Sequence, residues 1–379
     1  MSSHPHASDG TDHQLDDIVD VDDSDCVNSI MPNCPNFRRL CPGVRIYRSS
    51  RPDLLTDEEA GFFRDKLNIR TIIDLRSVSE YKKATGDKLV ANHYNLYKLK
   101  VPQRQYSRQE TVETEPLEQQ RVSRCSSVCN PDGTSSPSVP QPPSPSQQES
   151  SSTDHPHGKP SASDVDISAN TGNDTEGGGQ EMVERRHYLF DIFKAYPWLM
   201  FSRAPWYIQV YSIFVLLFDV IWGTGFKHFM RLYVRRVLNP QGILGQYKDM
   251  IEIGSKQICA ALKLLSSPDH VPALLNCTFG KDRTGVLCAL ILACLGKDKT
   301  YISRNYAQSA ALLEHVKDVL RDEMTRKYQL NETFITAEEQ TMMDLLTHIE
   351  EKYGSVTEYM EHIGFSREEQ KMLCENICR

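Results

Sequence analysis

The sequence predicts an α/β fold in which a central sheet is flanked by helices. Two observations carry this prediction: a strand, helix, strand order at residues 43–75, and a short apolar strand followed by an apolar helix at residues 271–296. A third observation concerns domain organisation, because the composition changes to Ser, Pro, Gln and acidic residues from about 103 to 181. We therefore predict one domain over residues 31–379, interrupted by a long disordered insertion at 103–181.

The N-terminal part of the domain contains the first strand, helix, strand unit. "GVRIYRS" at 43–49 predicts a short strand, and "IRTIIDL" at 69–75 predicts a buried strand. Between them, "TDEEAGFFRDKL" predicts a helix, with Thr56 as its N-cap and Glu59 closing a capping box. The acidic residues 1–30 precede this unit and are predicted to be disordered.

The C-terminal part is predicted to be mainly helical. "GQYKDMIEIGSKQICAALKLLSS" at 245–267 predicts one amphipathic helix, and "VPALLNC" after it predicts a short strand. "TGVLCALILACLG" at 284–296 is apolar on all sides, which predicts a buried helix. The last stretch, residues 332–379, is predicted to be helical throughout.

Charge and composition exclude some partners. The formal net charge of -8 argues against nucleic acid, because binding phosphates along a nucleic acid needs clustered basic residues. The acidic N-terminus has no apolar core and does not resemble a signal peptide. We therefore expect a cytoplasmic protein in a reducing environment, which suits a reactive thiol.

An apolar run from Trp206 to Trp222 is followed by basic residues at intervals of four, at Lys227, Arg231 and Arg235. Its 17 residues are at the lower limit for crossing a bilayer, and Asp219 disfavours crossing further. Three interpretations of residues 204–236 stay open: a lid or core helix of the domain, a helix that lies on a membrane surface, and a true span. The second would make the protein membrane-associated.

The stretch "NCTFGKDRTG" at 276–285 predicts a phosphate-binding loop. It lies between the apolar strand and the apolar helix, where backbone N–H groups at a helix N-terminus converge on an anion. Arg283 can bind two phosphate oxygens, and the same positive environment favours the thiolate of Cys277, the form that attacks phosphorus. Thr284 is placed to donate a hydrogen bond to that thiolate. The loop compensates the charge of the phosphate by itself, so no metal or other cofactor is expected.

Glycines give the loop its shape, since Gly280 permits the tight turn and Gly285 the close approach of the helix. Lys281 adds a cation, which favours substrates with more than one phosphate; the alternative is a solvated residue at the edge. The predicted phosphate-binding residues are Thr278, Phe279, Gly280, Lys281, Thr284 and Gly285.

The loop resembles the "HCxxGKDRTG" signature of the bacterial and fungal tyrosine phosphatase family that includes the mycobacterial phosphatase PtpB and the Listeria lipid phosphatase. "GVRIYRSSRPDLLTDEE", "IRTIIDLRSVSEY", "RNYAQSAALL" and "EKYGSVTEYMEHIGFSREEQKML" are also similar to that family. The resemblance implies a cysteine-phosphatase-like α/β sheet, with Cys277 as nucleophile and Arg283 as phosphate binder. Residues 206–222 fall where relatives carry helices over the active site, which favours a helical lid.

Two aspartates are candidates for the general acid. The family implies Asp282, inside the loop, whereas better-known tyrosine phosphatases carry this group on a separate loop. Asp74 in "DLRS" is the other candidate, and its alternative interpretation is a structural partner of Arg76 or Arg48.

Two positions depart from the family. Asn276 replaces the usual histidine before the nucleophile, although Sac-type phosphoinositide phosphatases also have asparagine there. Arg39 replaces the aspartate of the family's "NFRD".

The predicted activity is cysteine-dependent hydrolysis of phosphate monoesters through a phosphocysteine intermediate. Its substrates would be phosphotyrosine, phosphoserine or phosphothreonine proteins, phosphoinositides, or both, as for a dual-specificity phosphatase. The alternatives are a phosphate-binding pseudophosphatase and a membrane-associated adaptor.

Overall fold

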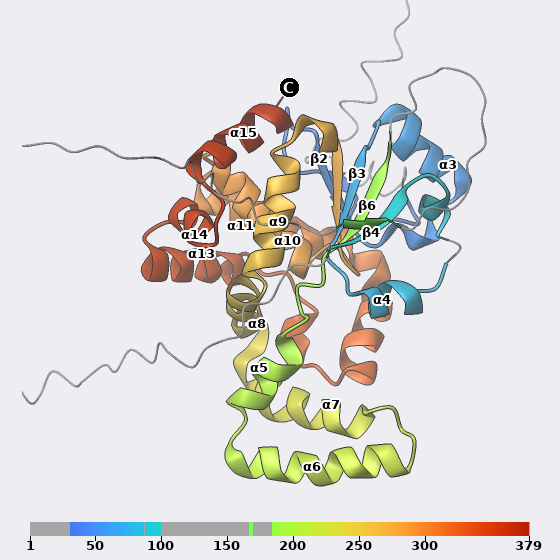
Figure 1. Cartoon of the computed structure of the whole chain (residues 1–379), viewed down its shortest axis with the longest axis vertical. Helices are drawn as coiled ribbons and strands as arrows, with labels where there is room; N and C mark the ends of the chain where they lie inside the picture. The colour runs from blue at the N-terminus through green and yellow to red at the C-terminus, as the bar shows by residue number, and fades with distance from the viewer. Residues whose placement is uncertain (1–30, 87, 100–166, 170–183, 379) are drawn as a thin grey trace, which may run out of the picture. The chain divides into compact units, whose positions relative to one another are not determined.

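Seven strands of the described residues form one sheet, in the order β1-β2-β7-β3-β6-β4-β5 (Figure 1). The computed structural model describes residues 31–86, 88–99, 167–169 and 184–378. The five inner strands run parallel, and an antiparallel strand closes each edge. The strands are β1 (Arg38–Arg39), β2 (Ile46–Ser49), β7 (Ala273–Asn276), β3 (Thr71–Asp74), β6 (Arg186–Leu189), β4 (Asn95–Leu99) and β5 (Ile167–Ala169). The predicted α/β class is confirmed.

Apolar side chains of the inner strands alternate between two cores, as the period of two in a strand requires. Ile73 and Leu275 belong to the larger core, whereas their neighbours Ile72 and Leu274 belong to the smaller one. Figure 1 shows α9, α10 and α13–α15 on one side of the sheet and α3 on the other. The strands at the centre are therefore covered on both faces.

Helices account for most of the remaining described chain. The longer ones are α5 (Tyr196–Arg203), α6 (Trp206–Ile221), α7 (Lys227–Tyr233), α8 (Asn239–Ile253), α9 (Ser255–Leu265), α10 (Asp282–Cys294), α11 (Lys299–Leu312), α13 (Glu339–Tyr353), α14 (Val356–His362) and α15 (Arg367–Ile377). The short α-helices are α3 (Asp57–Gly61), α4 (Val78–Lys83) and α12 (Lys317–Arg321). Single turns of π-helix are η2 (Phe62–Lys66), η4 (Val234–Leu238) and η7 (Asp322–Lys327), and those of 3-10 helix are η1 (Pro52–Leu54), η3 (Leu89–Asn92), η5 (Pro268–His270), η6 (Glu314–Val316) and η8 (Glu332–Phe334).

Most local predictions are confirmed, with one correction. Thr56 caps α3 and forms the predicted capping box with Glu59, and the strands expected in the first unit are β2 and β3. The helix predicted over 245–267 is wrong as a single element, because it divides into α8 and α9 at Gly254. A Cβ at Gly254 would lie 2.6 Å from the Ile192 side chain, so this position accommodates only glycine.

The two segments predicted to be disordered, 1–30 and 103–181, lie outside the described residues apart from β5. Ile167–Ala169 pairs with Tyr97–Leu99 of β4 at the edge of the sheet. The helical prediction for the C-terminal stretch is confirmed by η8 and α13–α15.

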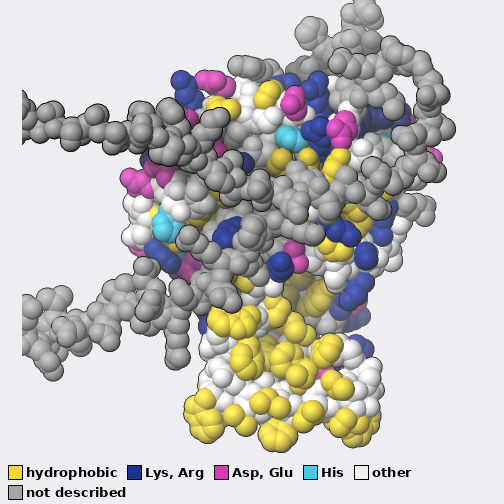
Figure 2. Space-filling model, in the orientation of Figure 1, with side chains coloured by type: hydrophobic (Ala, Val, Ile, Leu, Met, Phe, Trp, Pro, Cys, Tyr) yellow, Lys and Arg dark blue, Asp and Glu magenta, His cyan; other side chains and the backbone are white. Residues whose placement is uncertain are grey.

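Helix α6, the turn at 222–226 and α7 form a helical pair, which we call the α6–α7 hairpin. Its inner side packs on the protein through Ile208 and Tyr233, which lie in the larger core. The Tyr233 hydroxyl also donates a hydrogen bond of 2.9 Å to Ser212 Oγ, which joins the two helices. Its outer side is apolar and exposed, and Figure 2 shows hydrophobic side chains gathered over this part of the surface.

The exposure of α6 bears on whether residues 204–236 form a core helix, a lid or a membrane span. The core interpretation is wrong, because Trp206 is 76% exposed and Ile221 is 71% exposed. The lid interpretation stays a prediction. Within the described residues, no helix combines the length and the apolar composition that crossing a bilayer requires.

Candidate active site

The predicted phosphate-binding loop joins β7 to α10 at the carboxyl ends of the central strands. Parallel sheets bind their ligands at this end. β7 lies between β2 and β3, so Asn276 at its end is in register with Ser49 and Asp74. Cys277 follows at once and is only 3% exposed. The N-terminus of α10 then begins at Asp282, on the far side of the loop.

Gly280 makes the turn of the loop possible. Its φ of +65° lies in the left-handed region, and a Cβ there would come within 2.1 Å of the Ser49 carbonyl oxygen. Gly285, on the first turn of α10, faces the Tyr306 ring, which a Cβ would approach to 2.9 Å. Both glycines have the functions that the sequence predicts for them.

Side chains behind the loop bind its carbonyl groups. Asn36 Nδ2 donates to the carbonyls of Phe279 (3.0 Å) and Gly280 (2.9 Å), and Arg48 Nη2 donates to Gly280 (2.8 Å). In the part of the chain that the structure describes, no group accepts a hydrogen bond from the backbone N–H of residues 278–281. These N–H groups therefore remain available to an anion, as a phosphate cradle requires.

Arg283 is held by a carboxylate that the sequence analysis did not identify. Its Nη1 and Nη2 donate to the two oxygens of Glu80, at 3.0 and 2.8 Å, and Nη1 also reaches the Leu75 carbonyl at 3.1 Å. Nη2 further donates to Thr278 Oγ1 at 3.1 Å, within the loop. The guanidinium also lies 5.4 Å from the centre of the Phe193 ring. Its position is thus fixed before any phosphate binds.

Electrostatics keeps this pair ionised. Burial works to lower the pKa of Arg283, but the charges of Glu80 and Cys277 outweigh it and raise that pKa well above the ordinary value. Burial works to raise the pKa of Glu80, yet the charge of Arg283 brings it below the usual range. Glu80 is also the N3 residue of the Ser77 capping box that begins α4.

Lys281 corrects two predictions at once. Its side chain is fully buried rather than solvated, and its ammonium is 2.7 Å from Asp282 Oδ1, 3.2 Å from the Phe334 carbonyl and 2.9 Å from that of Thr336. An ammonium has three N–H groups, so these partners leave none for a substrate phosphate. Lys281 connects the loop to the segment at 334–336 and does not supply a second phosphate site.

Asp282 is the carboxyl group inside the loop that has access to solvent. Its Oδ1 accepts hydrogen bonds from Lys281 and from the Tyr247 hydroxyl, at 2.7 and 2.5 Å. Tyr247 is fully buried and also bonds Tyr306 at 2.7 Å between the two hydroxyls. Within the described residues, Oδ2 has no hydrogen-bond partner, and the side chain is 20% exposed. One oxygen is therefore fixed by its partners, and the other has none among the described residues.

The environment of Asp74 is that of a structural partner. Its carboxylate is fully buried and bonds Arg76 through Nε and Nη2, at 2.9 and 2.6 Å, while His187 Nε2 lies 3.2 Å away. Burial works to raise the pKa of Asp74, but the charge of Arg76 outweighs it and holds the pKa far below the usual range. A carboxylate so strongly ionised is a poor proton donor, which speaks against the general-acid prediction. Its partner is Arg76, whereas Arg48 binds the loop instead.

Two further polar side chains of the loop are buried without partners among the described residues. Asn276 has neither its oxygen nor its nitrogen paired, and Thr284 Oγ1 makes no hydrogen bond to Cys277 or any other described group. Thr278 and Phe279 are half-buried and lie at the more exposed side of the loop. Thr284 remains a candidate donor to Cys277, since its hydroxyl has no competing partner.

The structure thus brings Cys277, Asp282 and Arg283 together on one loop, with Asp74 nearby in a different environment. The groups that position them were not predicted from the sequence, because they come from distant segments: Asn36, Glu80, Phe193, Tyr247 and Tyr306. Only Glu80 had a local signal, the Ser77-x-x-Glu80 capping box.

Asp191 was also missed. It lies after β6, two residues before Phe193, and it is half-buried. Burial and the nearby charge of Glu80 raise the pKa of this carboxyl, which favours its protonated form.

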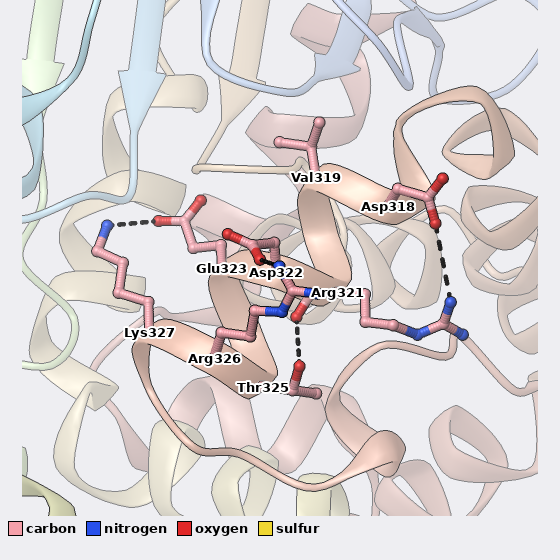
Figure 3. Close-up of a pocket in the computed structure, with 8 residues that line it drawn as sticks. All are labelled: Asp318, Val319, Arg321, Asp322, Glu323, Thr325, Arg326 and Lys327. Carbon is pink, nitrogen blue, oxygen red and sulfur yellow. Dashed lines mark hydrogen bonds and ion pairs between the residues drawn. The ribbon is translucent and has the colours of Figure 1, made fainter.

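A separate surface hollow is lined by α12 and η7 and contains no loop residue (Figure 3). Its charged side chains pair with one another, as Figure 3 shows for Lys327 with Glu323 and for Arg321 with Asp318. It offers no group to the chemistry of the loop.

The fold and the loop describe an α/β protein with a strand, loop, helix unit suited to an anion at the carboxyl ends of its parallel strands. The sequence model of the tyrosine phosphatase family matches residues 37–131 and 231–379, well over half of the chain. The chain therefore belongs to the tyrosine phosphatase family, whose members hydrolyse phosphoric monoesters. The first matched range includes the start of the predicted insertion, and the range between the two includes Phe193, α5 and α6. No curated protein matched the chain.

Proposed function

We propose that the protein hydrolyses phosphate monoesters through a phosphocysteine on Cys277. The single observation that carries this proposal is the loop itself: among the described residues the N–H groups at 278–281 have no acceptor, and the loop leads to Arg283, which Glu80 holds in place. Donors that are fixed before the reaction stabilise the charge that develops on the transferred phosphoryl group. We also propose that the chain belongs to the subgroup of the family with the "GKDRTG" loop, which includes the mycobacterial phosphatase PtpB and the Listeria lipid phosphatase.

In the first step the Cys277 thiolate attacks phosphorus. An S–P bond forms, the bond from phosphorus to the ester oxygen breaks, and that oxygen receives a proton from Asp282. The free Oδ2 is the atom suited to carry this proton, because Oδ1 already accepts two hydrogen bonds. Arg283 releases Thr278 Oγ1, and the N–H group that this frees on Nη2 binds a phosphoryl oxygen instead.

In the second step water attacks the phosphocysteine. Asp282, now ionised, accepts a proton from this water, the S–P bond breaks, and inorganic phosphate leaves with Cys277 restored as thiolate. Thr284 Oγ1 is the proposed donor to the leaving sulfur. Asn276 stays buried behind the nucleophile and takes no proton.

The proposed substrates are phosphotyrosine, phosphoserine or phosphothreonine proteins and phosphoinositides, which share a phosphate monoester. Lys281 gives no support for a second phosphate site, because its ammonium is already bound. The proposal therefore rests on the monoester alone.

Phosphate release from phosphotyrosine and phosphoserine peptides and from a panel of phosphoinositides tests the proposal. Cys277→Ser should reduce release from every substrate to background, whereas Cys378→Ser, an exposed cysteine far along the chain, should retain activity. Acid quenching with radiolabelled substrate should trap label on the wild type and on Cys378→Ser, but not on Cys277→Ser. Absence of release with retained binding of phosphate would instead favour the pseudophosphatase.

A further inference from the structure

The outer side of the α6–α7 hairpin has a composition unlike the rest of the described surface. The described residues expose nineteen large apolar side chains, and thirteen of them lie in the hairpin, between Trp206 and Met230. Trp198 and Phe201, on the adjoining α5, bring this stretch to fifteen. They include all three tryptophans of the chain, at 198, 206 and 222. Exposed apolar patches of this size mark interaction sites, and Trp and Tyr are the residues enriched where a membrane meets water.

The charged side chains on the surface of the same segment are all basic. Asp219 is the single acid between residues 196 and 238, and it is turned inward. Its carboxylate accepts hydrogen bonds from the Phe229 backbone N–H at 2.8 Å and from Thr224, and it lies 2.7 Å from His228 Nδ1. No negative charge of the hairpin is therefore left on its outer side.

The basic side chains of this segment are, by contrast, available. Among the described residues, no acidic group pairs with Lys227, Arg231, Arg235 or Arg236, and three of these four are exposed. Arg203, beside them, pairs with Asp249. The four residues form a cluster in the sequence, two in α7 and two in η4 directly after it, and this is notable in a chain whose net charge is -8. Basic residues beside an apolar helix face favour an anionic lipid surface.

The dimensions of α6 suit a helix that lies on a bilayer. Its 16 residues give a length of about 24 Å, less than the roughly 30 Å of the hydrocarbon core. Ile208, Ser212 and Asp219 recur on its inner side and are buried. The opposite side, with Trp206, Phe214 and Ile221, can therefore enter the interface while the inner side stays on the protein.

We propose that the α6–α7 hairpin binds the surface of an anionic lipid bilayer. A second copy of the chain fits less well, since it would bring two basic clusters together. The segment at 103–181 also fits less well, because it contains few large apolar residues. Most of the hairpin lies in the range 132–230 that the family match leaves out, so this surface is not part of what the match describes.

Binding of the hairpin to a bilayer would also assist the hydrolysis of phosphate monoesters on that bilayer. This consequence rests on the proposed phosphatase function. The chain runs from Phe193, over the Arg283 guanidinium, through α5 directly into α6. A hairpin held on a bilayer keeps the loop close to phosphate monoesters of the same surface. Phosphorylated lipids in an anionic vesicle should therefore be hydrolysed faster than the same lipids in neutral vesicles.

Sedimentation with vesicles of phosphatidylcholine, with and without phosphatidylserine, tests the binding without reference to activity. The wild-type full chain should sediment with the anionic vesicles. The triple variant Trp206→Ser, Phe214→Ser, Ile221→Ser should remain in solution, and Lys227→Ala, Arg235→Ala, Arg236→Ala should bind on the order of a hundredfold more weakly. The control Val319→Ser, Met372→Ser changes two exposed apolar residues outside the hairpin and should bind like the wild type.

Three results would overturn the proposal: no sedimentation of the wild type, equal binding of the hairpin variants, or a dimer that the apolar triple variant converts to a monomer. Release of phosphate from a small soluble ester serves as the folding control, since neither triple variant touches the loop. A protein that binds vesicles but hydrolyses nothing would contradict the proposed function and leave the docking proposal intact.

Discussion

Helices α6 and α10 are both apolar around most of their circumference, yet the fold buries one and leaves one side of the other exposed. α10 follows β7 after a short loop and is enclosed by the sheet and by α8, α11, α14 and α15, and ten of its residues are buried. α6 has only Ile208, Ser212 and Asp219 buried, and its outer side faces solvent.

The difference follows from the neighbours that the chain brings to each helix. A short connection from a central strand places α10 directly on the core, where its N-terminus meets the loop. α6 is joined to α5 at Pro205 and to α7 through Gly223 and Gly225, both with positive φ, and packs against α7. An apolar helix therefore indicates a partner, but only the topology decides whether this partner is the core or something outside the molecule.

The largest expected effect is at the first residue of α10. Asp282→Asn removes the proposed proton donor and should lower kcat by about 10²–10⁴-fold on an alkyl or seryl phosphate. The loss should be much smaller on an aryl phosphate with an activated leaving group, which needs no proton. Steady-state phosphate release on both kinds of ester measures this.

Asp191→Asn is the matched variant, since it removes the other solvent-accessible carboxyl near Arg283 and Glu80. It should retain most of the activity on both esters. The opposite pattern, with Asp191→Asn dependent on the leaving group and Asp282→Asn near normal, would transfer the general acid from the loop to the segment after β6.

The next effect concerns stability at the end of β3. Asp74→Asn leaves Arg76 buried with Asp53 as its remaining acid, and should cost about 3 kcal/mol of unfolding free energy. The folded-state pKa of Asp74 is depressed, so its contribution is complete above the unfolded pKa of about 3.9 and is lost as the pH falls toward the folded value. Urea unfolding of both proteins should therefore show a difference that shrinks below about pH 4.

A constant difference at every pH would mean that the carboxylate charge of Asp74 contributes nothing. Full stability of Asp74→Asn with loss of turnover would return Asp74 to its predicted catalytic role.

The sequence was most informative where the chemistry is local. The loop from Cys277 to Gly285, the strand before it, the helix after it and the Thr56 capping box follow from spacing and residue type alone. Positive φ at Gly280 and contact at Gly285 are consequences of the same pattern.

Residues that act across the fold could not be predicted in this way. Glu80 and Arg283 are 203 positions apart, and Asn36 and Gly280 are 244 apart, so no pattern in one sequence connects them. The predictions for Lys281, a second phosphate contact or a solvated side chain, were wrong because the sequence places a residue on a loop but does not give the direction of its side chain. Its side chain turns toward carbonyls at 334–336 that only the folded chain brings near.

The smallest expected effect is at Leu217 of α6, and the matching substitution in α10 shows the contrast between the two helices. Leu287 of α10 is fully buried, so Leu287→Ala should cost about 2–5 kcal/mol of unfolding free energy through lost contacts and a cavity. Leu217 of α6 is 53% exposed, and Leu217→Ala should change the unfolding free energy by no more than about 0.5 kcal/mol. Urea unfolding without lipid measures both. A loss at Leu217 as large as at Leu287 would mean that the outer side of α6 is covered by the chain itself, which would leave no surface for a bilayer.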